Sequence, residues 1–370
     1  MLDHNFTGPA FTVGVEEELM ILDPDGWGLA QAIEPLVKQI PERYEGQVKP
    51  ELMKSVLEIA TSPHPDIAGA GRELVELREM VIAAAEELGL AIGATATHPF
   101  AIARDQEISD RPRYHELVEE LGVIARNELI FGTHVHVGIE GADKAIYVAD
   151  GIRRYLPLLL ALSTNSPFWQ GDRTGLMSSR VPVFRAFPRE GVPPHYGTYE
   201  IFSHRVELMM RAGAIEDYTF LWWDVRPHPK LGTVETRVFD QQTRVEHTVA
   251  LAALVCSLAH RMSAAYDAEE PLVEYPSELI DDNKIRAARW GLDGDLIDFR
   301  AGEQVPAREM VRDLLGRLGP HAEELGCAEE LEGIDDLLEH GSGAHRQLAM
   351  AANCEDLPEL VAEIARVSKP

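Results

Sequence analysis

Apolar residues follow two spacings along this chain, one typical of helices and one typical of strands. They recur every three or four positions in 68–90 and 111–129, which predicts two amphipathic helices, and a third helix is expected over 143–163. Segments that alternate apolar and polar residues predict strands at 13–22, 56–61, 91–100, 130–139 and twice within 218–240. Because the strands lie far apart and the helices between them are uneven, the pattern favours an α+β domain built on an antiparallel sheet, mostly helical from about 245.

The first predicted strand, VGVEEELMIL, carries three consecutive glutamates. Side chains alternate faces along a strand, so Glu16 and Glu18 share one face while Glu17 points to the other, beside Val15 and Leu19. Like charges at this spacing repel each other, so the pair is expected to be solvated, to share a proton or to hold a cation. An edge strand with a wet face would explain the pattern without any chemistry.

Two further strands carry polar residues that could join this pair. Glu51 comes just before the predicted strand at 56–61, and Glu58 lies within it, facing away from its apolar neighbours. In GTHVHVGI, His134 and His136 share one strand face. Imidazoles two residues apart could both bind a metal, although buried histidines satisfied by their neighbours are more common.

Arginines accompany the acidic residues later in the chain. In GTVETRVFD, Glu235 and Arg237 share one strand face, which gives this carboxylate a cationic neighbour. The segment NSPFWQGDRTGLMSSR carries Arg173 and Arg180 among Gly and Ser residues. It could close as a loop over phosphate oxygens or an amino-acid carboxylate.

Composition narrows the class of protein. The chain has 370 residues and is 45% hydrophobic, which is enough for a sizeable core in one large domain or two. A formal net charge of −28, from 34 basic and 62 acidic residues, argues against nucleic acid or an anionic membrane as partner. Since the N-terminus has no leader pattern and no segment approaches about 18 uninterrupted apolar residues, a soluble, cytoplasmic protein is expected. Cys256, Cys327 and Cys354 have no CxxC spacing, which argues against disulfides or a thiolate zinc site.

The candidate metal ligands are mostly oxygen donors. Carboxylates with one or two imidazoles favour Mg²⁺ or Mn²⁺ over zinc, and magnesium commonly bridges to nucleotide phosphates, so the set indicates ATP chemistry. The chain contains neither a GxxxxGK[ST] loop nor the kinase motifs, which excludes the two commonest ATP-binding folds. A metal-dependent hydrolase or a non-catalytic nucleotide-binding protein could use the same residues, whereas a paired-carboxylate glycosidase would not need them all.

Seven segments, in order, resemble the motifs of the bacterial carboxylate–amine ligases of the glutamate–cysteine ligase type 2 family. They are GVEEELMILDP, LEIAT, GTHVHVGI, NSPFWQGDRTGLMSSR, VETRVFDQQT, NKIRAARWGLDG and GSGAHRQ, and they extend from about residue 11 to 350. The resemblance implies a glutamine-synthetase-like fold, in which an antiparallel sheet with flanking helices forms a funnel whose inner wall binds metals and ATP. It implies a single catalytic domain over 1–370.

The resemblance also implies roles for particular residues. Six side chains match metal ligands: Glu16, Glu18, Glu51, Glu58, His134 and Glu235. Arg237 and Glu235 match catalytic positions, Arg237 as a phosphate-binding residue, and Arg173 and Arg180 match substrate or nucleotide contacts. His136 matches a less specific position. The last two motifs are implied near the active site, but His345 stands where the family more often has Asp, so it receives no role.

The implied reaction has two steps. A carboxylate attacks the γ-phosphorus of ATP to give an acyl phosphate, and an amine then displaces phosphate to form an amide. The family name implies γ-glutamyl transfer to cysteine, or to another amine, with ATP and Mg²⁺ as cofactors, and a homodimer is also implied. In such a reaction the protein supplies positioning and charge neutralisation.

Overall fold

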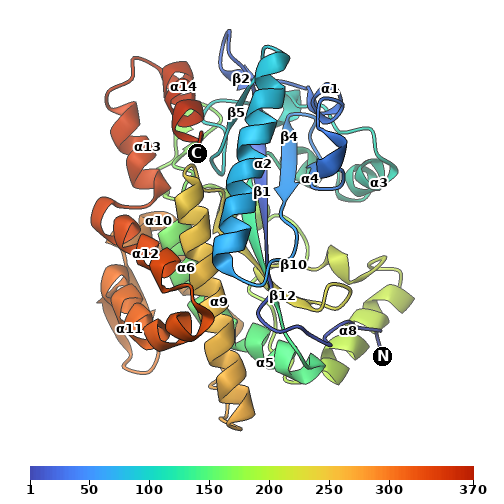
Figure 1. The fold of residues 1–370 in the computed structure, drawn as a ribbon, viewed down its shortest axis with the longest axis vertical. Helices are drawn as coiled ribbons and strands as arrows, with labels where there is room; N and C mark the ends of the chain where they lie inside the picture. The colour runs from blue at the N-terminus through green and yellow to red at the C-terminus, as the bar shows by residue number, and fades with distance from the viewer.

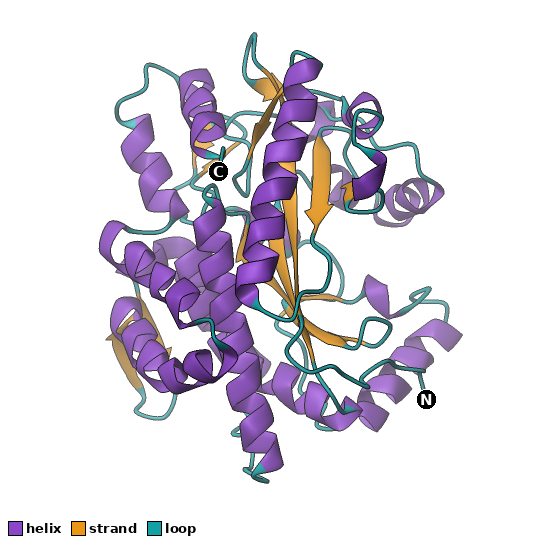
Figure 2. Ribbon diagram, viewed as in Figure 1, coloured by secondary structure: helices purple, strands orange, loops and turns teal.

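The computed structural model describes residues 1–370 and is built around an eight-stranded antiparallel sheet (Figure 2). Six strands form its main path, in the order β11 (Val225–His228), β12 (Thr233–Asp240), β6 (Gly132–Gly138), β1 (Val13–Asp23), β4 (Val56–Ala60) and β3 (Val48–Pro50). Two short strands also pair with β1, namely β2 (Gly28–Leu29) and β5 (Ala91–Gly93). All pairings in this sheet are antiparallel, which confirms the predicted α+β class.

The central strands separate an apolar face of the sheet from a polar one. Val15 and Leu19 of β1 are buried in the main hydrophobic core, whereas Glu16 and Glu18 line a cleft on the opposite face. Glu58 of β4 faces the same cleft, away from its buried apolar neighbours. The alternation follows from the two-residue period of a strand and confirms the predicted faces.

Two long helices, α2 (Ile67–Glu87) and α9 (Val245–Asp267), cross the apolar face of the sheet side by side (Figure 1). α2 packs on β1, β4 and β5, and α9 packs on β1 and β6. By length and composition α9 could cross a membrane, but 72% of its most apolar window is buried inside the fold. A helix that is apolar on most sides suits a protein interior, so α9 is the central core helix.

Two segments between the strands are shorter than the sequence pattern predicts. The helix expected over 111–129 is two helices, α3 (Pro112–Leu121) and α4 (Val123–Arg126). They are separated at Gly122, whose φ of +57° lies outside the helical region and suits a glycine. The strand expected over 91–100 is only the three-residue β5, and the residues after it continue as a loop.

The helix expected over 143–163 is also divided. It consists of α5 (Ala142–Ile152), the 3₁₀ turn η3 (Arg153–Tyr155) and α6 (Leu156–Ser163). Pro157 lies in the first turn of α6, where its missing N–H removes no helical hydrogen bond. A proline at that place therefore restarts the helix after the turn.

The C-terminal part is mostly helical, as predicted, and forms the orange-to-red side of the molecule in Figure 1. After α9 come α10 (Ser277–Trp290), α11 (Ala307–Leu325), α12 (Ala328–His340), α13 (Gly343–Ala351) and α14 (Leu357–Val367). A hairpin of β13 (Asp295–Asp298) and β14 (Glu303–Pro306) interrupts these helices. α11 and α12 pack on α9, and the core cluster that contains Val15 of β1 also contains Leu314 of α11, so these helices share the core of the sheet.

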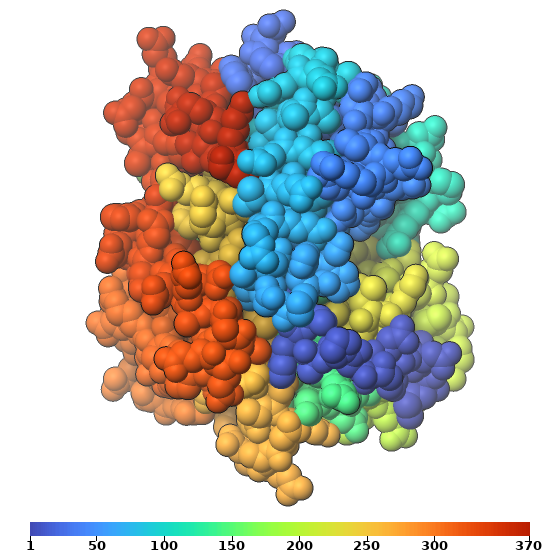
Figure 3. Space-filling view, in the orientation of Figure 1, coloured from blue at the N-terminus to red at the C-terminus, as the bar shows by residue number.

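Shorter elements complete the chain. The arginine-bearing segment predicted as a loop contains the hairpin β7 (Phe168–Trp169) and β8 (Asp172–Arg173) and the short helix α7 (Arg180–Phe184). The others are α1 (Ile33–Val37), η1 (Glu42–Tyr44), η2 (Ala103–Asp105), β9 (Glu190–Gly191), α8 (Tyr199–Arg211), η4 (Tyr218–Phe220), β10 (Trp222–Trp223) and η5 (Gly291–Asp293). Figure 3 shows the N-terminal segment in dark blue on the surface, running from beside the orange helices to the yellow-green α8, where the Leu2 amide donates to Ser203 Oγ.

Candidate active site

The polar face of the sheet lines a cleft of about 310 Å³. Its acidic lining residues are Glu16, Glu18, Glu51, Glu58, Glu128 and Glu235. Its imidazoles and positive charges come from His134, His136, His228, Lys49, Arg113, Arg226 and Arg237. So many carboxylates in one cavity repel each other unless cations offset them, which makes this cleft the candidate site.

Strand register explains how residues from distant segments meet here. Across the β4–β1–β6–β12 part of the sheet the directly opposed pairs are Glu58–Glu18, Glu16–His134 and His136–Glu235. Opposed residues of antiparallel strands point to the same face with Cβ atoms about 5 Å apart. The sheet therefore sets carboxylates and imidazoles in a row across four neighbouring strands.

Ligand atoms suited to a cation lie at the centre of this row. One ligand atom each from Glu16, His136 and Glu235 lie within 4.8 Å of one another. His136 Nε2 is 3.6 Å from Glu16 Oε1 and 3.9 Å from Glu235 Oε1, and His134 Nδ1 is 3.1 Å from Glu16 Oε2. The Nε2 atoms of both histidines are buried without a hydrogen-bond partner. Such atoms are costly to bury alone, so this donor set fits a bound cation.

Two arginines hold the carboxylate of Glu235. Arg237 Nη1 donates to Glu235 Oε1 at 2.5 Å, and Arg226 Nε donates to Glu235 Oε2 at 2.7 Å. Burial alone would raise the pKa of Glu235, but Arg226 and Arg237 outweigh it and hold the pKa well below its usual range. Burial is likewise outweighed at Glu16, where His136 and then His134 lower the pKa of the carboxyl. The carboxylates of Glu16 and Glu235, which form one half of the cleft, are therefore ionised and strongly paired.

In the other half of the cleft, the carboxylates of Glu51, Glu58 and Glu128 outnumber the positively charged side chains beside them. Burial and neighbouring glutamates raise the pKa of Glu58 to about 7, even though Lys49 Nζ lies 2.8 Å from its Oε1. Burial, with the charge of a neighbouring glutamate, raises the pKa of Glu128 to about 8, and the pKa of Glu51 rises for the same reasons. A divalent cation among these three carboxylates would favour their ionised forms.

The two arginines of the predicted loop occupy different environments. Arg180, the first residue of α7, is buried, and its Nη2 donates to the carbonyl of Arg237 at 3.2 Å. It also lines a smaller cavity of about 50 Å³ that shares Glu18 and Glu128 with the cleft. Arg173 in β8 is exposed and lines neither cavity. The structure thus places Arg180 next to the cleft but not Arg173, and the substrate contacts of both arginines stay predictions.

Several lining residues are absent from the sequence-based set. Arg226 could have been found, because it lies directly opposite Glu235 across the β11–β12 hairpin. Lys49 and Glu128 carry no local signal, since their roles depend on tertiary contacts. The same is true of an aromatic wall contributed by separate segments: Tyr114, Phe184, Phe187, Phe220 and Trp222.

The last two motifs of the resemblance do not line the cleft, although they were expected near it. His345 is the third residue of α13 and forms a capping box with Ser342, in which its Nδ1 accepts a hydrogen bond from the Ser342 amide at 3.1 Å. Lys284 is buried and pairs with Asp224 at 2.8 Å. The Asp224 carbonyl accepts a hydrogen bond from the Arg237 amide at 2.7 Å. Lys284, through Asp224, therefore helps to hold the strand that carries Arg237. A capping role explains why a histidine is tolerated at 345.

Comparison with known proteins matches nearly the whole chain. The model of the glutamate-cysteine ligase family 2 (GCS2) matches residues 12–363. A relative from Rubrobacter xylanophilus, named for glutamate–cysteine ligase 2-1, is 44% identical over 361 residues, which cover 97% of this chain and 95% of the relative. One from Sorangium cellulosum, named for glutamate–cysteine ligase 2, is 42% identical over 360 residues, covering 97% and 96%.

Solved structures share the fold at lower identity. The glutamate–cysteine ligase of Francisella tularensis in complex with AMP has a TM-score of 0.71 at 15% identity, covering 99% of this chain and 90% of that one. A bifunctional glutathione synthetase from Pasteurella multocida also has a TM-score of 0.71, at 16% identity, covering 97% and 52%. These likenesses show that the chain shares the fold of these two ligases. With the family match over 12–363, they lead to one conclusion: the chain belongs to the glutamate-cysteine ligase family 2 and is an ATP-dependent, amide-forming ligase.

Proposed function

We propose that the cleft binds ATP with divalent cations, that a carboxylate substrate is phosphorylated there, and that an amine then displaces the phosphate. The observation that carries this proposal is a pair of unpartnered Nε2 atoms, that of His136 facing Glu16 and Glu235 and that of His134 facing Glu18. Phosphate chemistry needs such cation ligands and also needs arginines close by. Both occur in this one cavity.

The chemistry of the donors supports Mg²⁺ or Mn²⁺ as the cation. All six ligands implied by the resemblance line the cleft: Glu16, Glu18, Glu51, Glu58, His134 and Glu235. His136 joins them, because its Nε2 faces both Glu16 and Glu235. When bound, the cations would offset the charge of the β- and γ-phosphate oxygens. Oxygen-rich ligand sets of this kind suit hard cations.

Arg237 is proposed as the catalytic residue for phosphoryl transfer. Its Nη1 is fixed by Glu235, while its Nε is buried without a partner and remains free to donate to a phosphate oxygen. Arg226 holds the second oxygen of Glu235, so the carboxylate orients both guanidinium groups. A donor fixed in advance stabilises charge that develops in the transition state without reorganisation at the moment of reaction.

The aromatic wall suits the parts of the substrates that carry no charge. Phe187 and Trp222 meet edge to face with ring centroids 5.5 Å apart, and the Arg113 guanidinium lies 5.1 Å from the Phe220 ring centroid. We assign this wall to stacking against the nucleobase and to keeping water from the acyl phosphate, which water would otherwise hydrolyse.

Glutamate as the carboxylate and cysteine as the amine are proposed from the family name and the Francisella relative. None of the three cysteines of this chain lines the cleft, and none of its lining residues is specific for a thiol. Other amines are therefore included as acceptors. Assembly as a homodimer also remains a proposal from the resemblance.

The test is ADP formation by the purified chain with ATP, Mg²⁺, glutamate and one amine at a time, with the product identified by mass. We expect ADP release that requires both the carboxylate and the amine. Glu16→Gln should lower it strongly at limiting Mg²⁺, and the matched variant Glu303→Gln, at an exposed position on β14, should not. ADP release that needs no amine, or an equally active Glu16→Gln variant, would contradict the proposal.

A further inference from the structure

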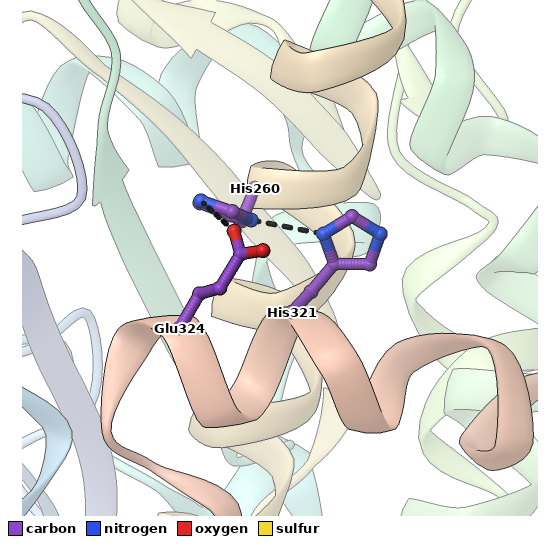
Figure 4. A group of neighbouring side chains, drawn as sticks. All are labelled: His260, His321 and Glu324. Carbon is purple, nitrogen blue, oxygen red and sulfur yellow. Dashed lines mark hydrogen bonds and ion pairs between the residues drawn. The ribbon is translucent and has the colours of Figure 1, made fainter.

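A second group of ligand-type side chains lies outside the cleft, where α9 meets α11 (Figure 4). His260 belongs to α9, and His321 and Glu324 belong to α11. The two histidine Nδ1 atoms are 3.0 Å apart, and His260 Nε2 lies 3.6 Å from Glu324 Oε2. One ligand atom from each residue lies within 4.8 Å of the other two. Two imidazoles and a carboxylate thus gather between two helices, with His260 facing His321 through Nδ1 and Glu324 through Nε2.

The packing of the two helices makes this convergence stable. His321 and Glu324 are three residues apart, which sets them on the same face of α11, and that face packs on α9. The His260 and His321 rings are tilted by 60° with centroids 5.2 Å apart. The His260 ring also packs on Phe11, whose centroid is 4.8 Å away, in the N-terminal segment that leads into β1. The His260 side chain is only 18% exposed.

A hydrogen bond between the histidines explains only part of this geometry. One Nδ1 must carry a proton for such a bond, while the other must present its lone pair. A cation would instead accept the lone pairs of both rings and the charge of Glu324.

We propose that His260, His321 and Glu324 bind a borderline divalent cation such as Zn²⁺, which ties α11 to α9. Zinc favours imidazole and carboxylate ligands in a tetrahedral arrangement, and three protein ligands leave the fourth position to water. Mg²⁺ prefers oxygen ligands, so this site differs in chemistry from the cleft, whose lining includes none of the three residues. We assign it the role of tying α11 to α9, because it joins these two helices and is not part of the cleft.

The sequence of α11 shows what such a link would stabilise. Gly316, Gly319 and Pro320 lie in the middle of this helix, directly before His321. Glycine and proline are the weakest helix formers, and proline also removes one main-chain hydrogen bond. A cation bound one residue later would fix this weak part of α11 to the central helix of the core.

The experiment uses the untagged, chelator-treated full chain carrying His136→Gln, so that the cleft loses one of its own imidazoles. Zn²⁺ is titrated while the melting temperature is followed, and Co²⁺ is titrated while its visible absorption reports the coordination geometry. We expect one site with a tetrahedral Co²⁺ spectrum and a rise in Tm of about 3 °C at a hundredfold excess over Kd. Mg²⁺ should produce neither signal at this site.

In the His136→Gln chain, the further change His321→Gln should abolish both the rise in Tm and the tetrahedral Co²⁺ spectrum. Glu324→Gln should weaken Zn²⁺ binding by about tenfold or more. Glu324 is 67% exposed, so its substitution leaves the fold intact. The matched control His204→Gln changes an exposed histidine on α8 and should bind Zn²⁺ as the background does. In the otherwise unchanged chain, His321→Gln should leave Mg²⁺-dependent ligase activity unaltered, which separates this proposal from that for the cleft. Equal Zn²⁺ binding with and without His321 would overturn it and leave only a histidine–histidine hydrogen bond.

Discussion

The buried ion pair between Glu17 and Arg78 predicts a large and specific loss of stability when its charge is removed. Arg78 Nε and Nη2 donate to the two carboxylate oxygens at 2.6 and 2.7 Å, and the side chains are 1% and 0% exposed. Thr248 Oγ1 donates to the same carboxylate at 2.6 Å, and Arg78 also donates to the carbonyls of Gln242 and Thr243. The pair therefore joins β1, α2, α9 and the segment after β12.

Glu17→Gln keeps the size of the side chain but leaves the guanidinium buried without a counter-charge. Removing one partner of a buried pair costs about 3–5 kcal/mol. The entropy of unfolding is about 2.1 cal/mol/K per residue, which for 370 residues gives about 0.8 kcal/mol/K. Dividing the two values predicts a fall in Tm of about 4–6 °C.

The assay is differential scanning calorimetry of Glu17→Gln beside Glu18→Gln. The control makes the same change one residue later, on the opposite strand face, where the side chain is 17% exposed and among other carboxylates. We expect Glu18→Gln to melt within about 1 °C of the parent or above it, because it relieves repulsion. Glu17→Leu combined with Arg78→Met should regain most of the lost stability, because no charge is then left unpaired. If Glu17→Gln melted together with Glu18→Gln, the assignment of opposite faces to these two residues would fail.

Three further predictions concern the cleft and one buried histidine. Glu16→Gln should lower the apparent Mg²⁺ affinity of the ligase reaction by about tenfold or more, and unchanged Mg²⁺ dependence would remove Glu16 from the ligands. Arg237→Lys should lower kcat by about 100-fold with little change in ATP affinity, whereas recovery at high Mg²⁺ would show that it only orients Glu235. Burial lowers the pKa of His98 from 6.5 to about 4. Between these pH values the unfolded chain binds a proton that the folded chain does not, so the free energy of unfolding falls by about 3 kcal/mol as the pH falls through this range. Urea unfolding at pH 7 and pH 4.5 should show a smaller pH effect for His98→Asn than for the parent, and an equal effect would refute this account.

The sequence could predict the faces of the strands because alternation is a local property. Glu16 and Glu18 separate from Glu17 by the period of β1 alone, and the same rule sets Glu235 and Arg237 on one face of β12. None of this requires knowledge of which strands are neighbours. The candidate ligands could therefore be proposed before the sheet order was known.

The partners of these residues could not be predicted in the same way. Lys49 meets Glu58, and Arg78 meets Glu17 across 61 positions of sequence, only because β1, β4 and α2 pack together. Glu128 follows α4, where no periodic pattern indicates a functional side chain. The prediction of one continuous helix over 111–129 was wrong for a different reason. The apolar spacing continues through Gly122, but the backbone leaves the helical conformation at this glycine.

The surplus of carboxylates over cations in the cleft also affects the order in which ligands can arrive. Six acidic lining residues face Lys49, Arg113, Arg226 and Arg237; the raised pKa values of Glu51, Glu58 and Glu128 keep part of this charge protonated near pH 7, but the whole chain carries a formal charge of −28. A nucleotide without its cation approaches a field of its own sign, which slows association, whereas the cation alone is drawn in. If the cleft is the ATP site proposed above, we expect this charge to make ATP enter fastest when it already carries magnesium or when magnesium has entered first. Raising the ionic strength should weaken this selection, because salt screens charges separated by more than about 10 Å.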